Sequence, residues 1–230
     1  MESYIVLDGV SKSFRSVEVL KPLSIEFEEG LIHGIVGRNG SGKTVMMKLI
    51  LGFLKPTQGT VTVAGREISG MNDRQLGTYR AEVIGFIFQF YNLLPSLTAY
   101  ENISLTKSIV KNAADADKLL DMVGLSKCRN KFPAQMSGGE QQRVSIARAL
   151  AKNPKILLGD EPTGALDSET GIIVLELLQR LCREEKKTVI IVTHNSDIAK
   201  CADKVIRMKN GKVKAITINE NPLDVKEVDW

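Results

Sequence analysis

The sequence predicts an α/β fold whose core is a mostly parallel sheet. Short apolar segments of strand character alternate with helical segments, two strand segments of antiparallel type come first, and a long helical stretch interrupts the alternation. We therefore expect one domain over residues 1–230. Residues 1–88 and 152–218 should form an N-terminal antiparallel β subdomain and the α/β core, residues 89–151 an inserted α-helical subdomain, and residues 219–230 a polar, loosely held tail.

The first part of the chain is expected to supply strands and one helix. Residues 4–7 and 23–27 alternate as antiparallel strands do, with a turn over 28–30. A buried strand over 31–36 runs directly into a glycine, and residues 43–54 follow as a helix. Phosphate-binding loops occur in this strand-to-helix arrangement.

Later segments continue the alternation of strand and helix. Strands are expected over 59–63, 83–88, 155–159 and 188–193, and helices over 115–123 and 139–151. Between the last two strands, four apolar residues fall at i, i+3, i+4 and i+7, on one face of a helix: Val174, Leu177, Leu178 and Leu181. Because parallel strands present their carboxyl ends at one edge of a sheet, polar residues that follow these strands should meet there.

Composition excludes several classes of protein. Of the 230 residues 43% are hydrophobic and 25% charged, as in a soluble globular domain, and a net charge of +4 is too modest to indicate nucleic acid. Cys128, Cys182 and Cys201 share no Cys-x-x-Cys spacing, which predicts reduced thiols rather than disulfides or zinc. The N-terminus lacks a signal-peptide pattern, and no apolar run approaches the about 20 residues of a bilayer span. Any membrane role should therefore depend on another chain.

Eight residues between the third strand and the first helix fit the pattern G-x-x-x-x-G-K-[ST] of a nucleotide phosphate loop. They are Gly37, Arg38, Asn39, Gly40, Ser41, Gly42, Lys43 and Thr44. The glycines let backbone N–H groups turn toward phosphate oxygens, and the helix N-terminus adds a favourable dipole. We expect Lys43 to direct its charge at the β- and γ-phosphates and Thr44 to bind magnesium. The alternative is a glycine-rich turn without a ligand.

Two adjacent carboxylates, Asp160 and Glu161, follow the strand 155–159 and should lie at the ligand edge. We expect Asp160 to hold magnesium through water and Glu161 to accept a proton from the attacking water. Taken alone, an acid pair after a strand is usually a helix-capping turn. The phosphate loop elsewhere in the chain favours the catalytic interpretation.

Two further polar residues end strands at the same edge. His194 follows the strand 188–193 and is placed to sense the γ-phosphate, whereas His33 lies inside a strand and is expected to be structural. Gln89 follows the strand 83–88, from which it could reach magnesium or the lytic water. An ordinary polar strand end is the alternative for Gln89.

The segment Ser137-Gly138-Gly139-Glu140-Gln141-Gln142-Arg143 opens a helix between the two nucleotide motifs. It resembles the signature of ATP-binding-cassette (ABC) ATPases. With the phosphate loop and acid pair in order, residues 4–218 resemble the ATPase subunits of ABC transporters, which implies a P-loop NTPase (RecA-like) core. The resemblance implies that the signature residues Ser137, Gly138, Gly139 and Glu140 touch ATP held by a second copy of the domain.

The same resemblance assigns a role to each motif. It implies that Phe14 stacks on adenine, that Gln89 is the Q-loop residue, that Glu161 is the catalytic glutamate and that His194 is the switch histidine. It also implies that three segments are family motifs: 37–44 is Walker A, 156–160 is Walker B, and 165–167 is the D-loop. Two residues depart from the family pattern. Val45 replaces a hydroxyl that bonds the α-phosphate, and Arg38 adds a charge to the loop; Val45 is expected to weaken nucleotide binding.

Three stretches, 84–95, 136–140 and 160–167, resemble the group of macrolide exporters, lipoprotein-releasing systems and antimicrobial-peptide exporters. This resemblance implies ATP and Mg²⁺ as ligands and a homo- or heterodimer of ATPase subunits that drives export or mechanotransmission. Separate integral membrane permease subunits would contact the region from Gln89 to Glu101. The chain would lie in the cytoplasm, peripheral on the inner face of the cell membrane, and bind no nucleic acid.

Other functions are weighed against this one. ABC ATPases of DNA repair interrupt the cassette with long insertions, for which the chain has no room, and translation-factor relatives carry two cassettes. A plain P-loop kinase or GTPase has no need of residues 137–139. A cell-division ATPase that signals across the membrane without transport uses the same parts, so that alternative stays open.

Overall fold

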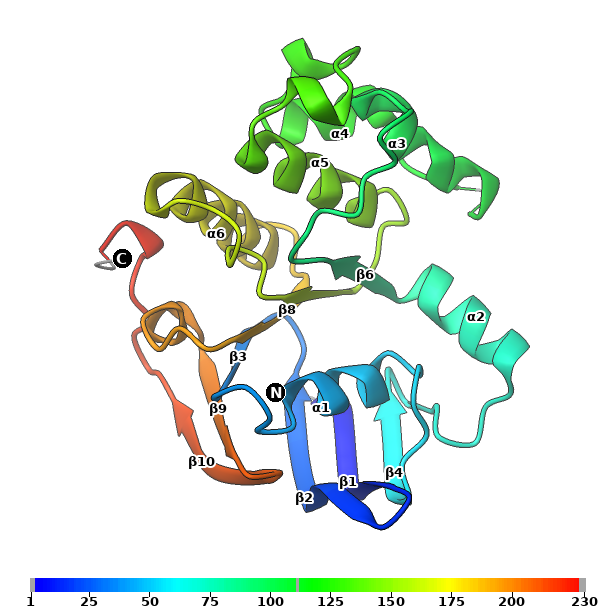
Figure 1. The fold of residues 1–230 in the computed structure, drawn as a ribbon, viewed down its shortest axis with the longest axis vertical. Coiled ribbons are helices and arrows are strands. Elements are labelled where there is room, and N and C mark those ends of the chain that lie inside the picture. Colours follow the sequence, from blue (N-terminus) through cyan, green and yellow to red (C-terminus); the bar gives the residue numbers. More distant parts are fainter. Residues whose placement is uncertain (1–2, 111, 228–230) are drawn as a thin grey trace.

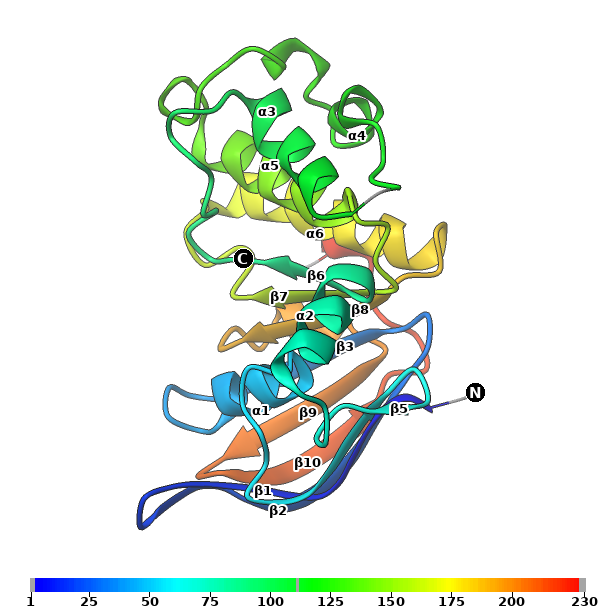
Figure 2. The same ribbon diagram turned by 90° about the vertical axis from the view of Figure 1, so that its right-hand side faces the viewer.

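Two β-sheets meet in the lower half of the molecule, and a group of helices stands above them (Figures 1 and 2). The computed structural model describes residues 3–110 and 112–227. The last residues of the expected tail, 228–230, lie outside the described residues, as do residues 1–2 at the start of the expected domain.

The smaller sheet is antiparallel and has the order β2-β1-β4-β5. Its strands are β1 (Ser3–Phe14), β2 (Val17–Glu28), β4 (Gln58–Val63) and β5 (Arg66–Glu67). The apolar residues that predicted short strands, among them Ile5, Leu7, Ile25 and Phe27, form the buried face. Strands β1 and β2 continue beyond the predicted ends to a tight hairpin around Arg15. The prediction stopped short because the outer halves of both strands carry polar residues and show no apolar alternation.

The larger sheet has the order β10-β9-β3-β8-β7-β6. The strands β3 (Ile32–Val36), β6 (Ile84–Ile87), β7 (Ile156–Asp160), β8 (Thr188–Thr193) and β9 (Lys204–Lys209) pair in parallel, and β10 (Lys212–Ile218) returns antiparallel to β9. The predicted parallel core is thus confirmed. The carboxyl ends of β3, β6, β7 and β8 lie at one edge, which positions the candidate site.

Helices complete both parts of the molecule. The core carries α1 (Lys43–Ile50), α2 (Asp73–Glu82) and α6 (Ser168–Arg183), and the upper part in Figure 1 contains α3 (Ala99–Ser104), α4 (Ala116–Met122) and α5 (Gly138–Leu150). The helix expected over 43–54 ends at Ile50, since Gly52 adopts a left-handed φ of 65°. Helix α2 was not predicted because only Leu76 and Tyr79 are buried on it, too few for a helical period.

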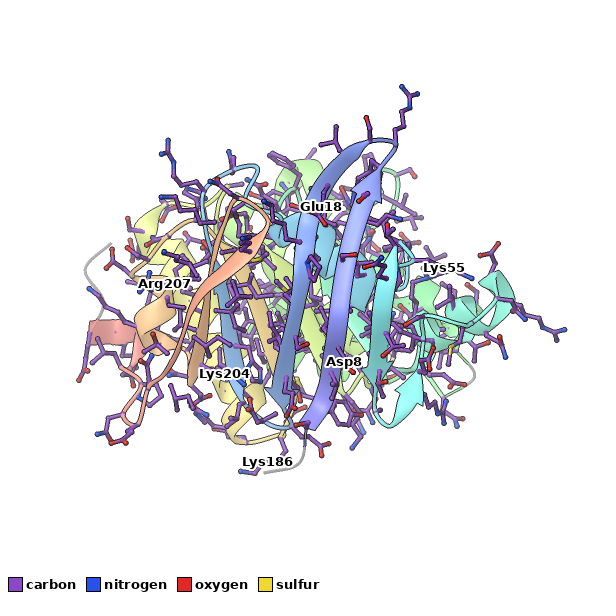
Figure 3. All side chains as sticks on the ribbon, turned by 90° about the horizontal axis from the view of Figure 1, so that it is seen from below. Asp8, Glu18, Lys55, Lys186, Lys204 and Arg207 are labelled. Atoms are coloured by element: carbon purple, nitrogen blue, oxygen red, sulfur yellow. The ribbon has the colours of Figure 1, made fainter. Side chains whose placement is uncertain are left out.

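One buried lysine joins the two sheets. Lys204 on β9 donates from Nζ to Glu26 O and to Glu28 Oε1, both at 2.7 Å, at the end of β2. Figure 3 shows Lys204 beside β2 at the lower end of the strands. His33 is completely buried next to this pair and bonds the carbonyl of Glu28 through Nε2, and burial lowers the pKa of its imidazole. The contacts agree with a structural role for His33.

The described part of the C-terminal tail is not loosely held, contrary to expectation. Asn219 donates from Nδ2 to the carbonyls of Ala199 and Ala202, and Leu223 N donates to Lys200 O. Val225 is only 1% exposed and belongs to the main apolar cluster, to which α6 also contributes. Two apolar residues, Leu223 and Val225, stand among polar neighbours and gave no sequence signal for this contact.

Among residues 3–110 and 112–227, no helix combines the length and the apolar character needed to cross a membrane.

Candidate functional site

The phosphate loop joins the end of β3 to the start of α1, as the sequence predicts. Gly37 must be glycine, because a Cβ there would lie 2.6 Å from both Met208 O and Ser41 Oγ. Gly42 is the N-cap of α1 with φ 102°, a conformation that other residues rarely adopt. The residues between them, 38–40, are exposed at the rim of the loop.

Two buried polar groups line the inside of this loop. The Lys43 ammonium donates to Gly37 O and, at 3.4 Å, to Arg38 O, although the side chain is buried. Ser41 Oγ is buried and finds no hydrogen-bond partner among the described residues. An ammonium and a hydroxyl donor placed at the N-terminus of a helix fit a phosphate group.

Glu161 lies just beyond β7 with both carboxylate oxygens engaged. Thr193 Oγ1 donates to Glu161 Oε2 at 3.0 Å, and His194 Nδ1 lies 2.8 Å from Glu161 Oε1. The backbone of Glu161 is left-handed, with φ 48°, and its N–H bonds Val192 O at 2.8 Å. Such a conformation costs about 1–3 kcal/mol in a non-glycine residue and persists only where the surroundings enforce it. The surroundings therefore fix the backbone that carries this carboxylate.

Gln89 lies near the base of the Glu161 side chain. A Cβ added to Gly164 would be 3.1 Å from Gln89 Nε2 and 3.2 Å from Glu161 Cβ, so both side chains border the same glycine. The structure therefore brings together Gln89, Glu161 and His194, which the sequence placed only at the ends of separate strands.

Magnesium could use Asp160 and Thr44 as ligands. Burial, followed by the neighbouring Glu161 carboxylate, raises the pKa of Asp160, and the nearby lysines Lys43 and Lys48 oppose this shift. In the described part of the chain, no group of three or more His, Cys, Asp or Glu side chains could hold a metal ion. Mg²⁺ is commonly bound by one or two protein oxygens together with substrate phosphates and water, and this donor set fits that pattern.

The signature residues form the N-terminus of α5. Ser137 is the N-cap: its Oγ accepts from Glu140 N at 3.2 Å, and its N–H donates to Glu140 Oε2 at 2.7 Å. Glu140 Oε1 also accepts from Cys128 Sγ and Lys131 Nζ. These contacts, with the Ser137 N–H as the largest cause, lower the pKa of Glu140 to about 2. The Glu140 carboxylate thus folds back on its own helix cap, and its expected contact with ATP stays a prediction.

The signature glycines are packed within their own chain. A Cβ on Gly139 would lie 1.9 Å from Thr170 Cγ2 at the start of α6, and one on Gly138 would lie 2.7 Å from the Tyr91 hydroxyl. Neither position has room for a side chain even within one subunit, so packing inside the chain already requires glycine here.

The remaining site residues lie at the edge of this region. Phe14 ends β1 and is 43% exposed, with Lys12 Nζ 5.2 Å from its ring centroid, so a face of the ring is accessible to a base. Val45 packs against the apolar cluster beneath α1, which explains an apolar residue where the family pattern has a hydroxyl. Arg38 is exposed.

Sequence reasoning missed residues that hold the motifs in place. Thr193 bonds the Glu161 carboxylate, and its position directly before His194 could have indicated this. Arg148 donates to the carbonyls of Asn92, at 2.7 Å, and Tyr91, at 3.0 Å, and both acceptors are left-handed. No sequence signal links Arg148 to a segment more than 50 residues away.

Comparison with protein families decides the identity. The model of the family described as "ABC transporter" matches residues 20–164, more than half of the chain. The chain belongs to the ABC transporter ATPase family. The matched residues include the loop 37–44 and the segment 137–140. The roles assigned to single residues, among them His194 as the switch histidine, stay predictions.

Known relatives agree with this assignment. A putative ABC transporter ATP-binding protein, MG065 homolog, of Mycoplasma pneumoniae is 44% identical over 215 residues, which are 92% of this chain but 46% of that relative. The chain therefore spans about half the length of that protein. The lipoprotein-releasing system ATP-binding protein LolD 1 of Rhodopseudomonas palustris is 37% identical over 93% of this chain and 99% of its own length. It belongs to the group that the sequence indicates.

A solved structure has the same fold. The ATP-binding cassette MJ0796, in a dimeric post-hydrolysis state bound to ADP and Pi, superposes with a TM-score of 0.84 at 38% identity and covers 93% of this chain and 98% of its own. The predicted P-loop NTPase fold with a β subdomain is confirmed.

Proposed function

We propose that this chain is the ATP-hydrolysing subunit of a bacterial ABC transporter and that two copies, or one copy and a similar subunit, close around ATP and Mg²⁺. The observation that carries the proposal is the group formed by Glu161, Thr193, His194 and Gln89 beside the Walker A loop. A strained carboxylate held by two hydrogen bonds is placed as a proton acceptor should be.

The residues of the proposed ATP site have separate tasks. Glu161 takes a proton from water, Gln89 and His194 orient that water and the γ-phosphate, and Lys43 leaves its loop carbonyls to bind the phosphates. Phe14 supports the adenine ring. Thr44, Asp160 and Gln89 would hold magnesium, which would neutralise phosphate charge.

The signature calls for a second subunit. The residues Ser137 to Glu140 form a capped helix N-terminus that suits a phosphate, but Gly37–Thr44 encloses the phosphates of its own chain. We propose that Ser137, Gly138 and Gly139, with Glu140 holding the cap, complete the ATP site of the partner. Hydrolysis therefore requires the dimer, because each ATP site is complete only when two subunits meet.

Replacing Lys43 with Ala tests nucleotide binding. We expect ATP affinity itself to fall at least about tenfold, because the lysine charge acts on the phosphates before any chemistry. Calorimetry on the purified variant measures this affinity. Lys55→Ala, which removes an exposed lysine outside the loop, should bind as the wild type does; equal affinities for all three proteins would contradict the assignment.

We propose that permease subunits of the cell membrane dock on a groove near Gln89–Glu101, so that the chain is peripheral on the inner membrane face. A hollow of about 460 Å³ is lined by Phe53, Phe86, Phe88, Leu105, Ile109 and the aliphatic parts of neighbouring basic residues. Phe90, next to it, is 72% exposed. Tyr91 is a poorer candidate than Phe90, because its hydroxyl turns inward and lies 3.4 Å from Ala165 O.

Phe90→Asp should abolish co-purification with the permease subunits while leaving the ATPase activity of the isolated chain unchanged. A charge beside the apolar groove is unfavourable once a docked partner excludes water. Ile218→Asp is the matched control, since Ile218 is 71% exposed on β10, away from the groove. Loss of the complex in both variants, or in neither, would refute this docking site.

The same ATPase parts serve a cell-division complex that signals without transport. The two functions differ in the membrane subunits, and transport of a substrate by the purified complex in vesicles separates them.

A further inference from the structure

Gln142 is a buried amide at the point where α5 meets the core. Its side chain is 0% exposed, and Nε2 donates to Phe88 O at 3.2 Å and to Pro162 O at 2.6 Å. Because both partners are carbonyl oxygens, only the amide nitrogen can face them, which fixes the orientation of the group. One side chain of the helical subdomain thus holds two loops of the core.

The two carbonyls belong to the immediate neighbours of the chemical groups. Phe88 precedes Gln89, and Pro162 follows Glu161. Glu161 has the left-handed φ of 48° that its surroundings must enforce. The hydrogen bond from Gln142 to the next residue is one such constraint, so loss of the amide frees the backbone on which the carboxylate is carried.

Packing alone does not account for an amide at this position. Gln142 Oε1 is buried and has no hydrogen-bond partner among the described residues. An unpaired buried acceptor is unfavourable, and an apolar side chain of similar size would avoid it. The two donated hydrogen bonds are what the amide provides and an apolar side chain does not.

Gln142 also lies on the helix that begins with the signature. Ser137 caps α5, and Gln142 follows five residues later, about 7.5 Å along the helix axis. A short helical segment moves as a rigid unit. A displacement of the cap therefore reaches the carbonyls of Phe88 and Pro162 through Gln142.

We propose that Gln142 is a positioning residue that couples the two ATP sites of the dimer. This inference rests on the proposed function: the signature of a subunit contacts the ATP of its partner, whereas Gln89 and Glu161 act on its own ATP. Engagement of the signature at one site then sets the placement of Gln89 and Glu161 at the other site through the Gln142 amide.

The first test is Gln142→Leu, which keeps a buried side chain of similar size and removes both hydrogen bonds. Small misplacement of reacting groups can cost about 10²-fold, so we expect kcat to fall roughly 10- to 100-fold. The ATP affinity of the monomer should stay unchanged, and the Hill coefficient for ATP should fall to about 1 from a higher wild-type value. If Gln142 only stabilised the fold, the variant would have a lower melting temperature but would not lose kcat and cooperativity while keeping the ATP affinity of the monomer.

Ser145→Ala is the matched control. Ser145 is a buried polar residue on the same helix, and its Oγ has no partner in the described part of the chain. This variant should keep kcat and the Hill coefficient of the wild type. It shows the effect of removing a buried polar group from α5 while the hydrogen bonds to Phe88 O and Pro162 O stay in place.

Gln142→Glu gives a second, independent readout. An ionised carboxylate would repel both carbonyls, whereas the protonated acid can donate to Pro162 O, and buried Glu residues can have pKa values of about 8–9. The ratio of variant to wild-type kcat should therefore rise as the pH is lowered from about 8 to about 6. This variant also decides the matter if Gln142→Leu does not fold.

The outcomes separate the inference from the proposed function. A wild type without ATPase activity, or without dependence on protein concentration, would refute the proposed dimeric ATPase. An active, cooperative wild type together with a Gln142→Leu variant of unchanged kcat and Hill coefficient would overturn the role of Gln142 alone. A pH-independent ratio for Gln142→Glu would do the same.

Discussion

Glu161→Gln is expected to bind ATP with Mg²⁺ as the wild type does and to hydrolyse it about 10²–10⁴-fold more slowly. The amide keeps the size of the side chain and the hydrogen bond from Thr193, but it cannot accept the proton of the attacking water. Because ATP then persists in both sites, the variant should accumulate as a dimer. Size-exclusion chromatography with ATP, beside a turnover assay, measures both effects.

Glu82→Gln is the control for the loss of one negative charge, since Glu82 is an exposed carboxylate at the end of α2. It should keep normal turnover and remain monomeric under the same conditions. Near-normal turnover by Glu161→Gln would remove Glu161 from its assigned role, whatever the state of the dimer.

Ser137→Asp is expected to leave the ATP affinity of the monomer intact and to reduce hydrolysis at least about 100-fold, because the new carboxylate would face the γ-phosphate of the partner's ATP. Asp is as good an N-cap as Ser, so α5 should still form. The measurements are monomer ATP affinity and ATPase activity against protein concentration. Wild-type activity should rise faster than linearly with concentration, and the activity of the variant should stay near zero.

Ser137→Asn is the matched control, because Asn has the size and capping ability of Asp without its charge. Equal losses in Ser137→Asp and Ser137→Asn would show that charge does not matter here, and the two-subunit site would be the wrong model. A substitution at Gly139 is a less specific probe. Any side chain there collides with Thr170 of the same chain, so a loss of activity would have two causes.

The candidate site residues could be picked out from the sequence because each motif is local, and their chemical roles stay predictions. The phosphate loop needs glycines, a lysine and a hydroxyl within eight residues, and the acid pair needs only a preceding strand. The strands β7 and β8 lie close to their predicted bounds, since both are buried on both faces and read as continuous apolar runs.

Elements with little apolar signal were not predicted. Helix α2 buries two residues, and β10 is an edge strand that is mostly exposed, so neither shows a hydrophobic period. The short tail 219–227 docks through backbone and amide hydrogen bonds, which leave no pattern in the sequence.

The sequence by itself determined which chemical groups this protein has: a phosphate loop, two carboxylates, a histidine, a glutamine and a capped helix. Only the tertiary structure decided how they meet. It placed Thr193 and His194 on the two oxygens of Glu161, turned Tyr91 inward, and set Gln142 between the loops of Gln89 and Glu161. These contacts join residues far apart in the chain, and the backbone angles that direct them depend on the packed surroundings rather than on neighbouring residues in the sequence.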